Sequence, residues 1–159
     1  MRFRLIDQIV RVTPGQSLDA VKNLTLGEEY LADHFPAFPV MPGVLMLEAL
    51  VQAGAWLLRL TEDFRHSVIV LREARGVKYG SFVEPGRRLQ LHVDLVNKDT
   101  QTGEAVAFKG SGEVDGVQTV AARFTLARYN LADRRAELAA VDRRLTDELR
   151  NEWAVLGPR

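Results

Sequence analysis

The sequence predicts an α+β fold in which a curved antiparallel sheet wraps around one long central helix. Three observations favour this fold class. A run that begins at Pro42 or Gly43 and ends near Leu60 is apolar on nearly every side, which is typical of a buried helix. Residues 88–96 alternate apolar and polar side chains, as a half-buried strand does. Asp115-Gly116 separates two extended runs and predicts a hairpin, so strands are available to cover the helix.

The other elements follow in chain order. The stretch 12–17, VTPGQS, predicts a turn, and residues 18–26 alternate well enough for a strand before the helix. Residues 27–43 contain three prolines within seven positions, which excludes a helix interior or a central strand and predicts a stiff, ordered loop. After the helix, strands are expected at 67–71, 88–96, 104–114 and 117–129.

A second helix of a different kind is expected at residues 131–153. Its apolar side chains form one stripe, and acidic and basic residues cover the remaining surface. The stripe consists of Leu131, Leu138, Val141, Leu145 and Leu149. We expect a C-terminal appendage on the surface, and we divide the chain into a domain of residues 1–130 and an amphipathic helix and tail of residues 131–159.

Length and composition limit the class of protein. The chain has 159 residues, a formal net charge of zero and no cysteine. These values suit one domain, give no reason to expect a nucleic acid partner, and exclude disulfides and cysteine-bound metals. The first ten residues lack a long apolar run, and the apolar stretch 40–58 is interrupted by polar residues and proline, so neither a secretory signal nor a membrane span is expected. A cytoplasmic protein is the expectation.

Glu48 lies within the otherwise apolar helix and needs an explanation. An ionised carboxylate is costly to bury unless it is paired, hydrogen-bonded or neutralised. Glu48, Gln52 and Arg59 fall near one helical face, so a polar stripe that meets water or a partner chain explains it without chemistry. A functional acid explains it equally well, because desolvated carboxylates often mark functional sites. His34, in the preceding loop, is by residue type alone more often structural than catalytic.

The expected start of the helix adds a third chemical group. The N–H groups of Gly43 and Val44 have no partner within the helix and lie at the positive end of its dipole. They are suited to bind a carbonyl oxygen that gains negative charge during a reaction. Glu48 follows five residues later, about 7.5 Å along the axis.

The segment HFPAFPVMPGVLMLEALVQ resembles the active-site region of the β-hydroxyacyl-acyl carrier protein dehydratases of the FabZ type. The matching positions are His34, Phe35, Pro36, Pro39, Pro42, Gly43, Val44, Leu45, Glu48, Ala49 and Gln52. The resemblance continues through 3–12, 20–30, 83–91 and 113–126, and so covers about residues 1–127. It implies a hot-dog fold, a homodimer joined edge to edge between sheets, and often a hexamer built as a trimer of dimers.

The resemblance also implies a reaction, the dehydration of (3R)-hydroxyacyl thioesters on acyl carrier protein to trans-2-enoyl thioesters in fatty acid biosynthesis or a related acyl pathway. His34 and Glu48 would be the catalytic pair of this lyase, contributed by different subunits, with no metal or organic cofactor. Neutral His34 suits removal of the C2 proton, and a protonated Glu48 suits donation to the leaving hydroxyl. Gly43, Val44, Phe35 and Gln52 complete the predicted substrate-binding set.

Two residues depart from the family pattern. Asp33 and Ala37 stand where glycines usually flank the His-Phe-Pro motif. A glycine with positive φ at either place would require a reshaped loop here, and Asp33 would favour protonated His34. A hot-dog thioesterase, an enoyl hydratase, and a non-catalytic subunit that binds acyl carriers therefore remain alternatives. His66 and His92 are expected to be structural.

Overall fold

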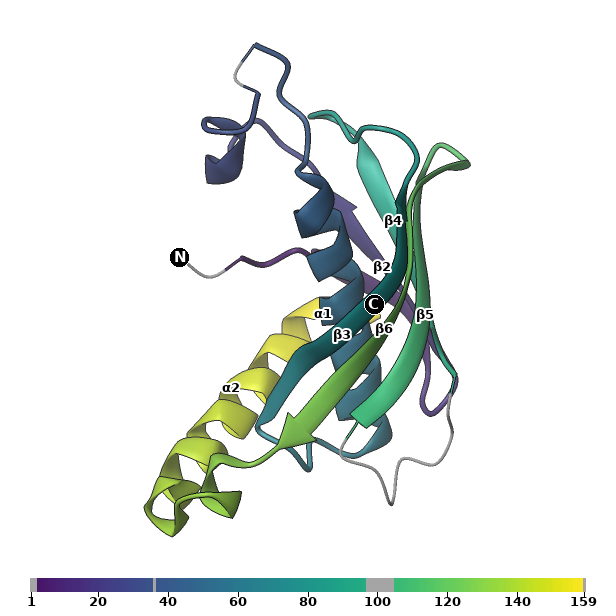
Figure 1. Cartoon of the computed structure of the whole chain (residues 1–159). Helices are drawn as coiled ribbons and strands as arrows, with labels where there is room; N and C mark the ends of the chain where they lie inside the picture. Colours follow the sequence, from purple (N-terminus) through teal and green to yellow (C-terminus); the bar gives the residue numbers. More distant parts are fainter. Residues whose placement is uncertain (1–2, 36, 97–104, 159) are drawn as a thin grey trace.

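One antiparallel sheet curves around helix α1 (Gly43–Thr61) in the computed structural model, which describes residues 3–35, 37–96 and 105–158 (Figure 1). The sheet has six strands in the order β1-β2-β4-β5-β6-β3, so β1 and β3 are its edges. The strands are β1 Gln8–Thr13, β2 Ser17–Asn23, β3 Val68–Tyr79, β4 Arg88–Leu95, β5 Ala105–Val114 and β6 Val117–Tyr129. The α+β fold class with a central helix is confirmed.

The core lies between the concave face of the sheet and α1. Leu89, Leu91, Val93 and Leu95 of β4 alternate inward, as the sequence pattern predicts. Leu50, Leu57 and Leu58 of α1 pack against them and are fully buried. A Cβ at Gly54 would lie 2.9 Å from the ring of Phe124, so glycine here lets α1 approach β6 closely.

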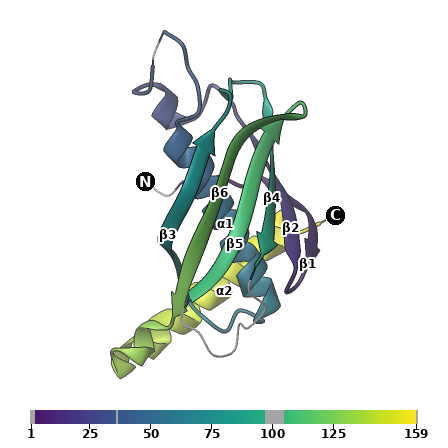
Figure 2. The ribbon, with the colours of Figure 1, turned by 45° about the vertical axis from the view of Figure 1, so that its right-hand side comes forward.

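Helix α1 agrees with its expected limits, but the expectation about its polarity was wrong. We expected the apolar run to be too polar to span a bilayer, whereas Gly43–Thr61 is long and apolar enough to do so by length and composition alone. Its buried side chains explain this composition, because the concave face of the sheet packs on one side of the helix. The helix is therefore the core of the fold (Figure 2).

Two strands differ from expectation. Strand β1 was missed, because Ile9 is its only fully buried side chain and no alternation is visible in the sequence. Strand β3 was expected at 67–71 but continues to Tyr79. Most of its side chains are exposed, so its second half lacks the period of a half-buried strand. The Thr13–Ser17 turn and the Asp115-Gly116 hairpin are confirmed, and both central residues of the hairpin have positive φ.

The C-terminal helix begins later than predicted. Helix α2 spans Ala139–Leu156, and residues 131–138 instead form two short 3-10 helices, Leu131–Asp133 and Ala136–Leu138. Buried Asp142 accepts hydrogen bonds from the N–H groups of Leu131 and Ala132 and from the Ser67 hydroxyl. These bonds fold the segment back onto the first turn of α2, which a continuous helix would not allow.

The charge of Asp142 is stabilised by the same contacts. Burial alone would raise the pKa of its carboxyl, but the hydrogen bonds from Ser67, Ala132 and Leu131 outweigh burial and lower the pKa. Helix α2 then crosses α1 obliquely, on the side away from β4 and β5 (Figure 1). The rings of Trp153 and Trp56 meet at 6.2 Å between centroids, so α2 is packed on the core helix through aromatic contact.

Candidate active site

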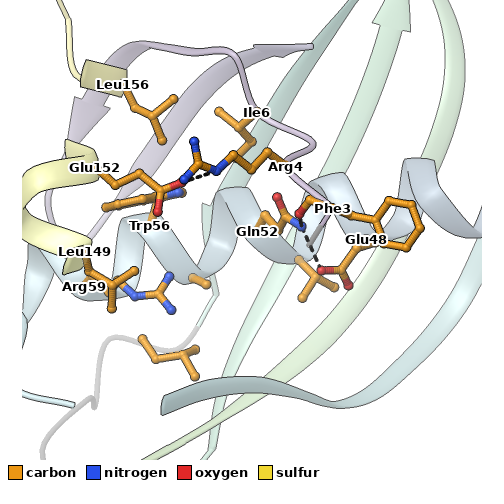
Figure 3. Close-up of a pocket in the computed structure, with 13 residues that line it drawn as sticks. Phe3, Arg4, Ile6, Glu48, Gln52, Trp56, Arg59, Leu149, Glu152 and Leu156 are labelled. Carbon is orange, nitrogen blue, oxygen red and sulfur yellow. Dashed lines mark hydrogen bonds and ion pairs between the residues drawn. The ribbon is translucent and has the colours of Figure 1, made fainter. Parts of the chain in front are cut away.

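Glu48 borders a cleft of about 210 Å³ that follows the exposed side of α1 (Figure 3). Its floor is α1, from Glu48 through Gln52 and Trp56 to Arg59. One wall is the N-terminal segment 3–6, and the other is α2. The polar stripe expected on this helix is thus present, and it faces a cleft that is enclosed on both sides.

Gln52 joins Glu48 to the N-terminal segment. Its side-chain Nε2 donates to Glu48 Oε1 at 3.0 Å and to the carbonyl oxygen of Phe3 at 3.1 Å. Its Oε1 accepts from the backbone N–H of Leu5 at 3.0 Å. Gln52, which the sequence predicts to bind substrate, thus holds the carboxyl group of Glu48 with its amide. The sequence places Glu48 and Gln52 one helical turn apart, but it contains no signal for the bonds to Phe3 and Leu5, which are far away along the chain.

The loop that carries His34 is anchored at both ends. Near its start, the buried Lys22 Nζ pairs with Glu28 Oε1 at 2.6 Å. At its end, the N–H of Met41 donates to the carbonyl oxygen of Val83 at 2.9 Å. Between these points, the N–H of His34 donates to the carbonyl oxygen of Tyr30 at 3.2 Å. The predicted loop is therefore present over the described residues 32–35 and 37–42, whereas Glu29–Leu31 form a short 3-10 helix and Pro36 lies outside the described residues.

The departure from glycine at Asp33 produces no left-handed backbone. Among the described residues, Asp33 has no positive φ, whereas Phe35 has φ of 48°. The ring of His34 lies 4.5 Å from the ring of Phe35, between centroids. The loop thus takes a positive φ at a residue that matches the family pattern, and Asp33 needs no strained backbone of its own.

The start of α1 presents the expected N–H groups. The N–H of Leu45 already donates to the carbonyl oxygen of Pro42 at 2.9 Å, so the N–H groups of Gly43 and Val44 precede the first bond of the helix. A Cβ at Gly43 would lie 3.0 Å from the ring of Tyr79 at the end of β3. Sequence reasoning missed Tyr79, and its ring makes glycine the residue that fits at position 43.

His34 does not line the cleft at Glu48 within one chain. The loop and its surroundings instead expose apolar side chains, among them Phe35 (59% exposed) and Val44 (68% exposed). Phe38 and Phe82 add an edge-to-face ring pair at 5.6 Å, also largely exposed. A contiguous group of exposed aromatic residues is typical of an interface.

The other histidines lie away from this region and have acidic partners. His66 contacts Glu62, and His92 contacts Asp19 and Asp94 on the outer face of the sheet. Burial alone would lower the pKa of His92, but the two carboxylates outweigh it and raise the pKa. Within the described residues, no three side chains of His, Asp or Glu gather as a metal site would require.

Comparison with known proteins agrees with this geometry. The FabA-like domain family matches residues 1–123. The chain is 43% identical over 139 residues to the 3-hydroxyacyl-acyl-carrier-protein dehydratase FabZ of Anaeromyxobacter sp., which covers 85% of this chain and 84% of that protein. The corresponding enzyme of Myxococcus xanthus is 40% identical over 124 residues, which cover 77% of this chain and 79% of that protein.

Solved structures resemble the fold at lower identity. The dehydratase heterocomplex ApeI:P from Xenorhabdus doucetiae aligns with a TM-score of 0.67 at 17% identity, and covers 86% of this chain and 90% of that chain. A Streptococcus mutans protein bound to acetyl CoA aligns with a TM-score of 0.59 at 13% identity. The alignment covers 80% of this chain and 92% of that chain. These two similarities concern the fold alone. The family match and the sequence identities together establish that the chain belongs to the FabA-like hot-dog domain family and is a homologue of the FabZ dehydratases.

Proposed function

We propose that this protein is a lyase that dehydrates (3R)-hydroxyacyl groups on acyl carrier protein to trans-2-enoyl groups. The observation that carries the proposal is the position of Glu48, held by Gln52 at the edge of a cleft along the core helix. Relatives that carry the FabZ name at about 40% identity support the same reaction. The catalytic domain is residues 1–130, and residues 131–159 are appended to it.

Glu48 is the general acid. Gln52 Nε2 can only donate, so the bonded Oε1 of Glu48 must be an acceptor, and a proton on the neutral carboxyl group resides on Oε2. Oε2 then donates that proton to the hydroxyl at C3, which leaves as water. Gln52 therefore acts as a positioning residue that directs the acidic proton.

His34 is the general base for the other half of the reaction. Its neutral imidazole removes a proton from C2, and the C–H electron pair forms the double bond as the C3–O bond breaks. Negative charge that develops on the thioester oxygen is bound by the N–H groups of Gly43 and Val44. Phe35 and Val44, both exposed on the single chain, cover the thioester side of the substrate.

The complete site requires two copies of the chain. Strand β3 is a long edge strand whose backbone is unpaired on one side, with exposed Val70 and Leu71. Such an edge invites pairing with another strand, and the β3 of a second copy is a suitable partner about a two-fold axis. His34 of one protomer then serves Glu48 of the other, which agrees with the absence of His34 from the lining of the cleft. A trimer of such dimers in the cytoplasm is the expected assembly.

A direct assay tests the function. The purified protein is incubated with 3-hydroxybutyryl and crotonyl thioesters of acyl carrier protein, and enoyl absorbance is followed. Glu48→Gln and His34→Ala should each lower kcat by about 10²–10⁴-fold, the usual contribution of a general acid or base. The amide in Glu48→Gln still accepts the Gln52 bond, so the fold should be retained.

Matched controls separate this effect from a general loss of charge. Glu113→Gln and His92→Ala change the same residue types on the outer face of the sheet and should keep normal turnover. Release of free acid in place of enoyl product would identify a thioesterase. Lack of any turnover with a normally folded protein would identify a non-catalytic subunit.

A further inference from the structure

The cleft continues past the catalytic carboxylate toward α2. Glu48 and Trp56 are eight residues apart on α1, which corresponds to about 12 Å along the helix axis. Beyond Trp56 the cleft meets Leu149 and Leu156 of α2, as Figure 3 shows. Leu156 is buried, and Trp153 of the same helix packs on Trp56. The far end of the cleft is therefore made by a helix that is fixed to the core.

An ion pair spans the two walls at this end. Arg4 Nε of the N-terminal segment lies 3.6 Å from Glu152 Oε1 of α2, so the two walls of the cleft meet there. The guanidinium of Arg59 lies over the Trp56 ring at 5.4 Å from its centroid. Arg4, Arg59 and Glu152 thus line this end together with Trp56, Leu149 and Leu156, and the leucines and Trp56 form its apolar part.

The order of the proposed catalytic groups along α1 gives the direction in which the acyl chain would extend. The proposed oxyanion site, at Gly43 and Val44, lies at the start of α1, and the proposed acid for the C3 hydroxyl is Glu48, one turn further. Carbons beyond C3 must continue in the same direction, which leads along α1 toward Trp56. Helix α2 lies outside residues 1–123 that match the family, so this end of the cleft is an addition to the shared domain.

We infer that α2 forms the end wall of the acyl pocket and restricts the enzyme to short and medium 3-hydroxyacyl chains. This inference rests on the proposed function and names its substrate class. An extended chain advances roughly 1.2 Å per bond, a third of the span of one residue, so about 12 Å accommodates about ten bonds. Counted with the three carbons up to C3, chains longer than about thirteen carbons should therefore meet α2.

The chain-length profile tests the wall. kcat/KM is measured with 3-hydroxyacyl-acyl carrier proteins of even length from four to about sixteen carbons. For the native protein, kcat/KM should fall at least about tenfold between the longest chain that fits and the next longer one. The reason is that one excluded methylene typically changes kcat/KM by about 10–200-fold. Leu149→Ala should move this break to longer chains, and Leu149→Phe should move it to shorter ones. Both variants should turn over the four-carbon substrate normally.

A control variant and an alternative wall variant accompany this test. Val155→Ala changes an exposed residue of the same helix that does not line the cleft, so its profile should match the native one. If Leu149→Ala unfolds, Leu156→Ala removes the neighbouring part of the wall. Equal rates on all lengths, or superimposable profiles for the native protein and both Leu149 variants, would overturn the end wall while leaving dehydration intact. Absence of turnover on every length would refute the proposed function and this inference with it.

Discussion

Complementation between two inactive variants tests whether the active site is shared between protomers. The chain leaves the edge of β3 unpaired and keeps His34 out of the lining at Glu48. A two-fold dimer would then contain two equivalent sites, each with His34 from one copy and Glu48 from the other. His34→Ala and Glu48→Gln are co-expressed with different affinity tags, so that mixed dimers can be identified.

The expected magnitude follows from symmetry. In a mixed dimer, one site receives both substitutions and the other receives neither. Random pairing of equal amounts makes about half of the dimers mixed, and half of their sites are intact, so activity should return to about a quarter of the native value. Each variant alone should retain about 1% or less, since removal of a general acid or base costs about 10²–10⁴-fold. The signal therefore stands well above the background.

The assay follows enoyl absorbance on the unfractionated mixture and on dimers isolated through both tags. Isolated mixed dimers should reach about half of native activity, because one of their two sites works. Co-expression of two differently tagged copies of the same variant is the control and should stay at background. If verified mixed dimers are as inactive as the control, His34 and Glu48 act within one chain, and the shared site is refuted.

Two further predictions concern stability. Asp142→Asn should lower the thermal midpoint at neutral pH, because an amide cannot accept from Ser67, Leu131 and Ala132 together. The folded pKa of Asp142 is lowered, so its contribution is present above the unfolded pKa, near 3.8, and is lost as the pH falls through the folded value. The midpoints of the native and Asn proteins should converge in acid, and a constant difference from pH 7 to pH 2 would contradict this reasoning. Gly80→Ala places a Cβ 2.3 Å from the Gln118 carbonyl oxygen and should cost about 1–3 kcal/mol of unfolding free energy, or roughly 2–12 °C in Tm. Gly27→Ala meets only an ordinary 3.5 Å contact and is the matched control, so an equal Tm for the two variants would show that the strand shifts freely.

The predictable parts of the fold are those where burial alternates strongly along the chain. Helix α1 and strands β4 to β6 bury regular sets of apolar side chains, so their patterns predict them closely. Strand β3 exposes most of its side chains in the single chain, so nothing in its second half distinguishes it from a loop. The predicted start of α2 was wrong because Leu131 and Leu138 fit a helical stripe in the sequence. In the structure, the hydrogen bonds of Asp142 determine the backbone of this segment.

The candidate site was predictable in residue type but not in its connections. The motif and the cost of a buried carboxylate both single out Glu48, and the loop prolines single out the segment of His34. The bonds from Gln52 to Phe3 and Leu5 involve backbone atoms, which any sequence provides, so no pattern indicates them. Tyr79 was missed for a similar reason, since its contact with Gly43 depends on how far β3 extends.

The meeting of Arg4 with Glu152 has a consequence for synthesis of the protein on the ribosome. The core helix α1 emerges before strands β3 to β6, so its apolar surface is not covered until most of the sheet has been translated. The cleft forms later still, because one wall comes from residues 3–6 and the other from α2. Contacts between such distant segments form slowly and leave apolar surface open in the meantime. A nascent chain thus cannot assemble the cleft until α2 is released, and until then the apolar side chains of its lining stay exposed.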